Sequence, residues 1–179
     1  MSSPVRVVVS VGTDHHPFDR LMGWLETWYA AQGDGVTLFV QHGSSRLPGT
    51  ADGAVLMPRE ELRARMGEAD VVVLQAGPGG IIDALVMGRR PIVVPRLPEL
   101  GEIVDGHQVA FARHLAEQDQ IDVAEDEPGL ARLLDESVAS PGSRVRERYV
   151  VRSAETARRI GDIVEQLVAS GGRELPTEG

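Results

Sequence analysis

Residues 71–88 read VVVLQAGPGGIIDALVMG, and this stretch decides the class of fold. Val71–Leu74 is an unbroken aliphatic run rich in β-branched residues, the pattern of a strand buried on both faces. A glycine- and proline-rich turn at 75–80 follows at once, and Gly79–Gly88 then repeats apolar side chains at helical spacing. A strand, a tight turn and a helix in this order predict one unit of a parallel α/β sheet.

The same alternation extends outward over most of the chain. Further strands are expected at Val5–Val11, Val36–Val40, Ala54–Met57, Pro91–Pro95 and Ile121–Val123. Further helices are expected at Phe18–Ala31, Pro58–Gly67, Asp105–Glu117 and Pro128–Glu136, with a long one at 144–169. Strands that alternate with helices imply right-handed crossovers. We therefore predict one doubly wound α/β domain at 1–143, a C-terminal helix at 144–169 and a disordered tail at 170–179.

Composition limits the classes of function. The 179 residues include 18 basic and 27 acidic side chains, for a net charge of −9, whereas nucleic-acid binding needs a basic footprint. Cysteine is absent from the sequence, which excludes disulfides, thiolate metal sites and cysteine nucleophiles. No stretch approaches the roughly 20 apolar residues of a membrane span, and the N-terminus lacks the pattern of a signal peptide. We expect a soluble, cytoplasmic protein that does not bind nucleic acid.

Ligands bind sheets of this kind at the carboxyl ends of the strands, where loops lead into helices. The turn QAGPGG at 75–80 is the first such loop. Gly77, Gly79 and Gly80 let the backbone approach a ligand closely, and the following helix N-terminus attracts anions. Asp83 lies near enough to reach a ribose hydroxyl beside a bound phosphate. Alternatively, the loop is only a tight turn and Asp83 complements the helix dipole.

Two common nucleotide motifs do not match this loop. The dinucleotide fingerprint requires a third glycine where this chain has Ile82, and it follows the first strand of the fold rather than a middle one. A P-loop requires Gly-Lys followed by Ser or Thr, and the sequence contains no lysine.

The loop VGTDHHPFDRL at 11–21 lies at the end of the first strand. Gly12, Thr13 and the amides around them suit a second phosphate or polar group. His15 or His16 could act as an acid or base near neutral pH. Alternatively, Asp14 tightens the turn and both histidines are solvated. Adjacent histidines also suggest a metal, but we find no third or fourth ligand at matching spacing and predict no metal site.

The segment RLPELGEIVDGHQ at 96–108 is long and polar. Its acceptors and one amide suit the hydroxyls of a sugar, although Asp105 is equally explained as a solvated helix cap. The candidate side chains are Glu99, Glu102, Asp105, His107 and Gln108.

Three motifs in order, at 11–21, 67–96 and 101–118, resemble the C-terminal nucleotide-sugar-binding domain of GT-B glycosyltransferases of the family 28 type. The resemblance spans roughly residues 5–136. It is strongest to the small stand-alone catalytic subunits of two-part UDP-sugar transferases, found in dolichol-linked oligosaccharide synthesis and in bacterial exopolysaccharide synthesis.

This resemblance implies a Rossmann-like domain, the C-terminal half of a GT-B fold, that binds a UDP-sugar without metal or other cofactor. Gly12 and Thr13 would belong to the first phosphate loop, and the three glycines of 75–80 to the second. Asp83 would be the acidic ribose ligand, and His107 and Gln108 would lie at the donor-sugar end. Such enzymes invert the anomeric centre by direct attack of an acceptor hydroxyl. The catalytic base comes either from another subunit or from this chain, where we choose His15.

The sequence also departs from the family pattern. Relatives read His-Gly-Gly-Pro-Gly-Ser at 75–80, so Gln75 and Gly80 replace two polar contacts to the nucleotide or diphosphate. His16 replaces a residue that is usually glutamine, and the tyrosine expected after QHG at 41–43 is missing. A catalytically inactive nucleotide-sugar-binding or scaffold protein of the same fold is therefore the alternative function.

A GT-B enzyme needs a second domain for its acceptor, and 179 residues leave no room for one. The resemblance thus implies a separate acceptor-binding subunit, which in the family is anchored in the membrane and recruits the soluble one. The helix predicted at 144–169 has an apolar stripe and a basic face, and either packs on the domain's own sheet or contacts this partner. A third possibility is a homo-oligomer that is active without a partner.

Overall fold

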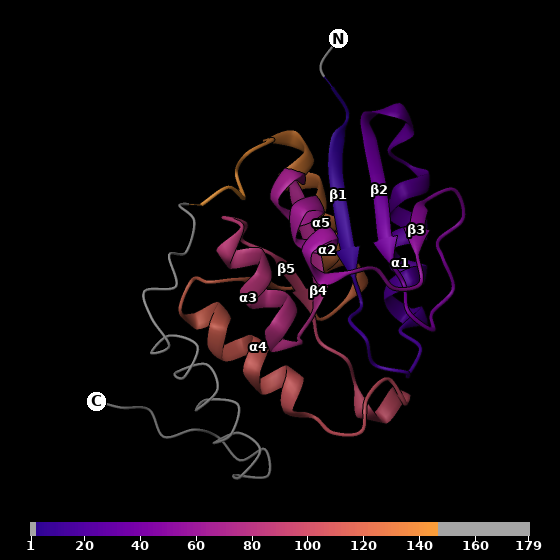
Figure 1. Ribbon diagram of the computed structural model, residues 1–179, viewed down its shortest axis with the longest axis vertical. Coiled ribbons are helices and arrows are strands. Elements are labelled where there is room, and N and C mark those ends of the chain that lie inside the picture. Colours follow the sequence, from indigo (N-terminus) through magenta and orange to yellow (C-terminus); the bar gives the residue numbers. More distant parts are fainter. Residues whose placement is uncertain (1–2, 147–179) are drawn as a thin grey trace.

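Six parallel strands form the centre of the computed structural model, which describes residues 3–146 (Figure 1). The strands are β1 Val5–Ser10, β2 Val36–Gln41, β3 Asp52–Ala54, β4 Val71–Gln75, β5 Ile92–Val94 and β6 Asp122–Val123. Their order in the sheet is β3-β2-β1-β4-β5-β6, so the chain winds outward from the centre in both directions. The reversal lies between β1 and β4, and ligands bind such sheets at this point.

Helices cover both faces of the sheet. They are α1 Asp19–Ala30, α2 Arg59–Glu68, α3 Pro78–Val86, α4 His107–Glu117 and α5 Glu127–Ala139, with short 3₁₀ turns at Gly33–Gly35 and Pro98–Leu100. One apolar cluster joins α1 and α5 to the sheet, and a second joins α2, α3 and α4 to the opposite face. The predicted doubly wound α/β fold is confirmed.

The apolar runs of the sequence explain the burial of the central strands. In β1 every residue except Arg6 is buried, and Val71–Leu74 of β4 are all buried. Val7 and Val9 belong to the cluster beneath α1 and α5, whereas Val8 belongs to the cluster beneath α2, α3 and α4. Alternate side chains thus fill both cores, as a β-branched run between two helical layers requires.

Several element boundaries differ from the prediction by one to three residues, and two of the differences have a physical cause. The third strand was expected at Ala54–Met57 but is Asp52–Ala54, because the ladder with β2 pairs Phe39 with Asp52 and ends at Ala54. The apolar Val55 and Leu56 are 58% and 56% exposed instead of buried in a strand. The helix expected from Asp105 begins at His107, since the Asp105 carboxylate accepts a hydrogen bond from the His107 N–H in the preceding turn.

The predicted helix over 144–169 lies, from residue 147 onward, outside the described residues. Its first three positions form a turn and a short antiparallel bridge between Val145 and Arg89. Arg144 is buried there, and its guanidinium binds Asp122 at 2.6 Å and the Ser137 hydroxyl. Within residues 3–146, the helices lack the length and apolar character needed to cross a bilayer.

Candidate functional site

The loops after β1 and β4 begin side by side. Ser10, the last residue of β1, is the register partner of Leu74 in β4, so both loops emerge at the carboxyl edge of the sheet. The segment after β5 leaves the same edge, since β5 pairs in parallel with β4. The three loops proposed from the sequence therefore lie along the carboxyl end of the sheet, with the β1 and β4 loops at the reversal of strand order.

The N-terminus of α3 is open. Gly77 is its N-cap, Pro78 is its first residue, and within the described chain no side chain caps it. The Ile81 N–H already bonds to the Gly77 carbonyl, which leaves the amides of Gly79 and Gly80 without intrahelical partners. A Cβ built at Gly79 would meet no described atom within 4 Å, so the space beside this residue is open. These amides and the helix dipole form an uncapped, electropositive end.

Behind this end, the buried guanidinium of Arg96 ties three loops together. Arg96 is 0% exposed and follows β5. It donates to the carbonyls of Val11 and His16 in the first loop, and to the carbonyl of Glu102 in its own segment, at 2.8–2.9 Å. Its Nε donates to Gln75 Oε1 at 3.1 Å. Burial lowers the pKa of Arg96, and the charges of Asp14 and Glu102 oppose that shift.

Gln108 joins the same network. Its Oε1 accepts from the Arg96 backbone N–H at 3.2 Å, and its Nε2 donates to Gln75 Oε1 at 2.9 Å. We call Gln75, Arg96 and Gln108 the amide network. Sequence reasoning selected Gln108 but missed Arg96 and treated Gln75 as a loss. An arginine directly after the apolar run PIVVP was the available signal.

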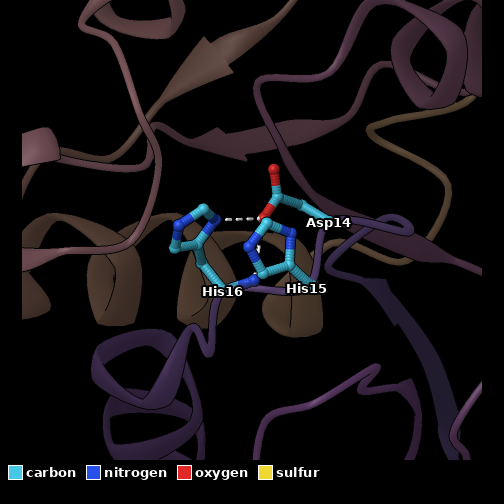
Figure 2. A group of neighbouring side chains, drawn as sticks. All are labelled: Asp14, His15 and His16. Carbon is cyan, nitrogen blue, oxygen red and sulfur yellow. Dashed lines mark hydrogen bonds and ion pairs between the residues drawn. The ribbon is translucent and has the colours of Figure 1, made fainter.

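In the first loop, Asp14 and His16 form a close pair (Figure 2). Asp14 Oδ1 lies 2.6 Å from His16 Nδ1 and accepts the His16 backbone N–H at 2.8 Å. Burial raises the pKa of Asp14, but its hydrogen bonds to His16 and the charge of Arg96 lower that pKa by more. The pairing places a proton on Nδ1 and leaves Nε2 of a neutral His16 as an acceptor. His15, the catalytic residue chosen from the sequence, has a side chain 86% exposed and lies beside the His16 ring, with centroids 4.0 Å apart.

Asp14, His15 and His16 also bring three potential metal-ligand atoms within 4.8 Å of one another. The spacing argument overlooked Asp14 as a third ligand because it considered the histidines alone. However, Asp14 Oδ1 already accepts two hydrogen bonds from His16, which an ion would have to displace. Absence of a metal therefore stays a prediction.

The two acidic site candidates are already paired. Asp83 is 7% exposed, and its carboxylate accepts hydrogen bonds from Nε and one terminal nitrogen of Arg59 on α2, at 2.9 and 2.7 Å, with Arg63 Nε at 3.6 Å. Glu102 is 4% exposed; its carboxylate binds Arg20 through two contacts of 2.9 Å and accepts the Leu97 N–H. Arg59 and Arg20 were not singled out from the sequence, and no motif there marks them as partners.

The structure thus brings together some of the candidate residues. Gly12 and Gly77 flank the Gln75 amide, Gln108 bonds to it, and Thr13 is exposed in the adjoining loop. His107 opens α4 beside Gln108, and its Nδ1 is buried with no hydrogen-bond partner in residues 3–146. The carboxylates of Asp83 and Glu102 bond to arginines outside this group.

The described cavities lie away from the glycine loops. The larger, about 340 Å³, opens at the opposite edge of the sheet and is lined by residues that include Arg90, Asp122 and Arg144. The smaller, about 170 Å³, is lined by residues that include Arg20, Pro95 and Val109.

Comparison with known proteins gives concordant results. The model of the glycosyltransferase family 28 C-terminal domain matches residues 49–151. A UDP-N-acetylglucosamine–N-acetylmuramyl-(pentapeptide) pyrophosphoryl-undecaprenol N-acetylglucosamine transferase of Rubrobacter xylanophilus is 28% identical over 121 residues, which cover 65% of this chain and 35% of the relative. The chain therefore spans about a third of the length of this curated relative.

Solved structures agree on the fold. A glycotransferase of kitacinnamycin matches with a TM-score of 0.58 at 20% identity, over 95% of this chain and 40% of that one. The solution structure of ALG13 matches with a TM-score of 0.56 at 19% identity, over 93% of this chain and 98% of that one. MurG of Acinetobacter baumannii matches with a TM-score of 0.54 at 15% identity, over 93% and 51%. With the family model matching more than half of its residues, the chain belongs to the glycosyltransferase family 28 C-terminal domain family.

Proposed function

We propose that this chain is the donor-binding catalytic subunit of an inverting, metal-independent glycosyltransferase. It transfers a hexose or N-acetylhexosamine from a UDP-sugar to a lipid-linked or polysaccharide-precursor acceptor, together with a separate acceptor-binding subunit. The observation that carries the proposal is the uncapped N-terminus of α3, which opens beside the first glycine loop at the reversal of strand order. In a domain of this glycosyltransferase family, that position suits a donor diphosphate.

The residues then take separate roles. The amides of Gly79 and Gly80 bind the diphosphate, with Gly12 and Thr13 on its other side. Leaving-group charge is stabilised by these fixed dipoles, which need no reorganisation during the reaction. His107 lies at the donor-sugar end, and Asp83 takes a ribose hydroxyl in exchange for part of its contact with Arg59. Glu102 supports the site by accepting hydrogen bonds from the Arg20 guanidinium and the Leu97 N–H.

A proton must leave the acceptor hydroxyl as it attacks the anomeric carbon. If this chain supplies the base, His16 has a better geometry than His15, because Asp14 fixes its Nδ1–H and leaves Nε2 as the acceptor. His15 lacks such an orienting contact at hydrogen-bond distance, since its Nδ1 lies 3.9 Å from Asp14 Oδ1. The other source of the base is the acceptor subunit.

Two observations support an acceptor-binding half in addition to this domain. The Rubrobacter relative, whose name includes a lipid-linked acceptor, is almost three times as long as the region it shares with this chain. Around the site, the large apolar side chains of Val55, Leu56, Leu100 and Val104 are 56–81% exposed in the loops after β3 and β5. A partner that covers this rim would bury them and close the site. A membrane-anchored partner would recruit this subunit to the cytoplasmic face of the membrane.

Thermal unfolding of the purified chain tests the proposal. UDP, UDP-glucose, UDP-galactose, UDP-GlcNAc, UDP-glucuronate and GDP- and dTDP-sugars would each be added, with and without EDTA. A ligand at 100 times its dissociation constant stabilises by about 2.7 kcal/mol, which is a readily measured shift. We expect a shift with one class of UDP-sugar that EDTA does not change. No shift with any donor, for the chain alone and for the chain with its partner, would overturn the proposal and favour a scaffold protein.

A further inference from the structure

We propose that Gln75 presents its carboxamide NH₂ as a hydrogen-bond donor to the diphosphate of the donor, and that buried Arg96 is the positioning residue that fixes this orientation. The inference rests on the proposed function, because it names how this same site would recognise the anion. Gln75 stands where relatives have histidine, and this replacement suggested that a polar contact to the donor is lost. The inference assigns such a contact to Gln75.

The orientation of the carboxamide follows from its neighbours. A guanidinium only donates hydrogen bonds, so the atom of Gln75 that faces Arg96 Nε at 3.1 Å must be the oxygen. Gln108 is fixed in the same way, since its oxygen accepts the Arg96 backbone N–H and its NH₂ therefore turns to Gln75. The oxygen and nitrogen of a glutamine carboxamide have nearly the same shape, so its orientation must be assigned from hydrogen bonds. Here the Nε–H and the backbone N–H of Arg96 can only donate, and they assign the oxygens of Gln75 and Gln108.

The free end of the carboxamide points between the two glycine loops. Gln75 Nε2 would lie 2.4 Å from a Cβ built at Gly12 and 2.5 Å from one built at Gly77. Both contacts are too short for a real side chain, so glycine at these positions makes room for this amide. The next residues after Gly77 form the open N-terminus of α3. The NH₂ group thus lies next to Gly77, the N-cap residue of α3.

This NH₂ group has no hydrogen-bond partner among the described residues and is accessible to solvent. Every hydrogen bond made to the Gln75 side chain within residues 3–146 ends on Oε1. The buried unpaired side-chain atoms of the same residues are Arg63 Nε, Arg90 Nε and His107 Nδ1, and Gln75 Nε2 is not among them. The Gln75 NH₂ group is therefore a solvent-accessible donor with a fixed orientation near the N-terminus of α3.

The chemistry of this arrangement favours an anion over a neutral ligand. A hydrogen bond from an amide to a phosphate oxygen is charge-assisted and stronger than one between neutral groups. The Arg96 charge lies directly behind the carboxamide, where it draws electron density toward Oε1 and strengthens the N–H donors on the other side. The replacement of histidine by Gln75 therefore keeps a donor at this point, carried by a group whose protonation does not change with pH.

Calorimetric titration of the full chain with UDP and with uridine tests the inference. Gln75→Glu retains an oxygen for Arg96 but replaces the donor with a carboxylate oxygen. We expect the affinity for UDP to fall by about tenfold or more, and the affinity for uridine, which lacks phosphates, to stay within about twofold. Gln118→Glu adds the same negative charge at an exposed position, the C-cap of α4, and should leave both affinities unchanged. Gln75→Met, which removes the donor without adding charge, should also weaken UDP selectively.

Arg96→Lys tests the positioning role. Lysine keeps the positive charge but cannot hold Oε1 and the three carbonyls at once. We expect the ratio of UDP to uridine affinity to fall in the wild-type background and to show no further fall in the Gln75→Met background. A purely structural role would weaken both ligands together and add to the Gln75 effect.

The outcomes separate this inference from the proposed function. A wild-type chain that binds no uridine nucleotide contradicts the function itself. A wild-type chain that binds UDP while folded Gln75→Glu and Gln75→Met bind it equally well overturns the role of Gln75 and leaves the function intact. Thermal melting of each variant shows whether it is folded under the titration conditions.

Discussion

At the scale of single residues, Arg96 explains why the loops of the site hold one arrangement. Within the described residues, its guanidinium makes four hydrogen bonds, which reach the ends of β1 and β4 and the segment after β5, and its central carbon lies 4.7 Å from the centre of the Phe18 ring. A lysine would supply one point of charge, whereas the planar fork meets several carbonyls in fixed directions. Arg96 therefore fixes the geometry of the loops around the candidate site.

Replacing Arg96 should be costly for folding. Arg96→Met leaves the buried carbonyls of Val11 and Glu102 without their donors, and each unsatisfied group costs about 1–3 kcal/mol. We expect a loss of at least about 2 kcal/mol in the free energy of unfolding, measured by urea denaturation at unchanged m value. Arg113→Met is the matched control: its side chain is 62% exposed and pairs with Glu125, so its loss should stay below about 1 kcal/mol. Equal losses for the two variants would contradict the role of Arg96.

The Asp14–His16 pair predicts a pH dependence of stability. The pKa of Asp14 is lowered in the folded chain, so the unfolded state binds the proton more readily and ionised Asp14 stabilises the fold above the unfolded pKa of about 3.9. That contribution is lost as the pH falls through the lower, folded value. The melting temperature of Asp14→Asn should thus lie below wild type at pH 6–7, and the gap should close below about pH 4. Asp34→Asn, at an exposed turn, should show no such gap. A gap for Asp14→Asn that is constant from pH 3 to 7 would rule out this linkage.

At the scale of elements, the sequence predicted the positions of the strands that are buried on both faces. The runs in β1 and β4 are apolar because helices cover both faces, and their positions were correct to within one or two residues. The edge strand β3 was misplaced, since the apolar Val55 and Leu56 look like strand residues but lie in solvent beyond the end of the ladder. Side-chain partners were harder still. The contact between Arg96 and Gln75 spans 21 positions and that between Arg20 and Glu102 spans 82, and no local pattern encodes either pairing.

The ion pair between α2 and α3 predicts opposite changes in uridine affinity for substitutions of its two partners. Asp83 on α3 is buried, whereas the Arg59 side chain on α2 is 67% exposed, so the ion pair is worth only about 0.2–1 kcal/mol. If Asp83 takes a ribose hydroxyl, Arg59 competes with the nucleoside. Arg59→Met should then tighten uridine binding by up to about fivefold, while Asp83→Asn weakens it. Calorimetric titration with uridine measures both, and weakening by both variants would mean that Arg59 itself contacts the nucleoside.

At the scale of the whole molecule, the two edges of the sheet differ in character. The carboxyl edge carries the glycine loops, the amide network and four exposed apolar side chains, at Val55, Leu56, Leu100 and Val104. The opposite edge carries the larger cavity and Arg144, with Val145 as its exposed apolar residue. Apolar side chains that ring a binding surface have no stabilising role in the isolated chain, since they contribute to neither core. We infer that they are buried when the acceptor-binding subunit closes the site.

The apolar rim can be tested separately from the donor site. Leu100 and Val104 are 56% and 81% exposed, so replacing both with serine should change the melting temperature by little and leave the UDP-induced shift intact. With the acceptor-binding subunit present, the same double variant should lose association and most of the transfer from the UDP-sugar, because several exposed apolar contacts would be missing from the interface. Val145→Ser, at the opposite edge and 49% exposed, is the matched control and should retain both. Normal association and transfer by the double variant would place the partner elsewhere, whereas loss of the UDP shift would mean that the rim loop shapes the donor site itself.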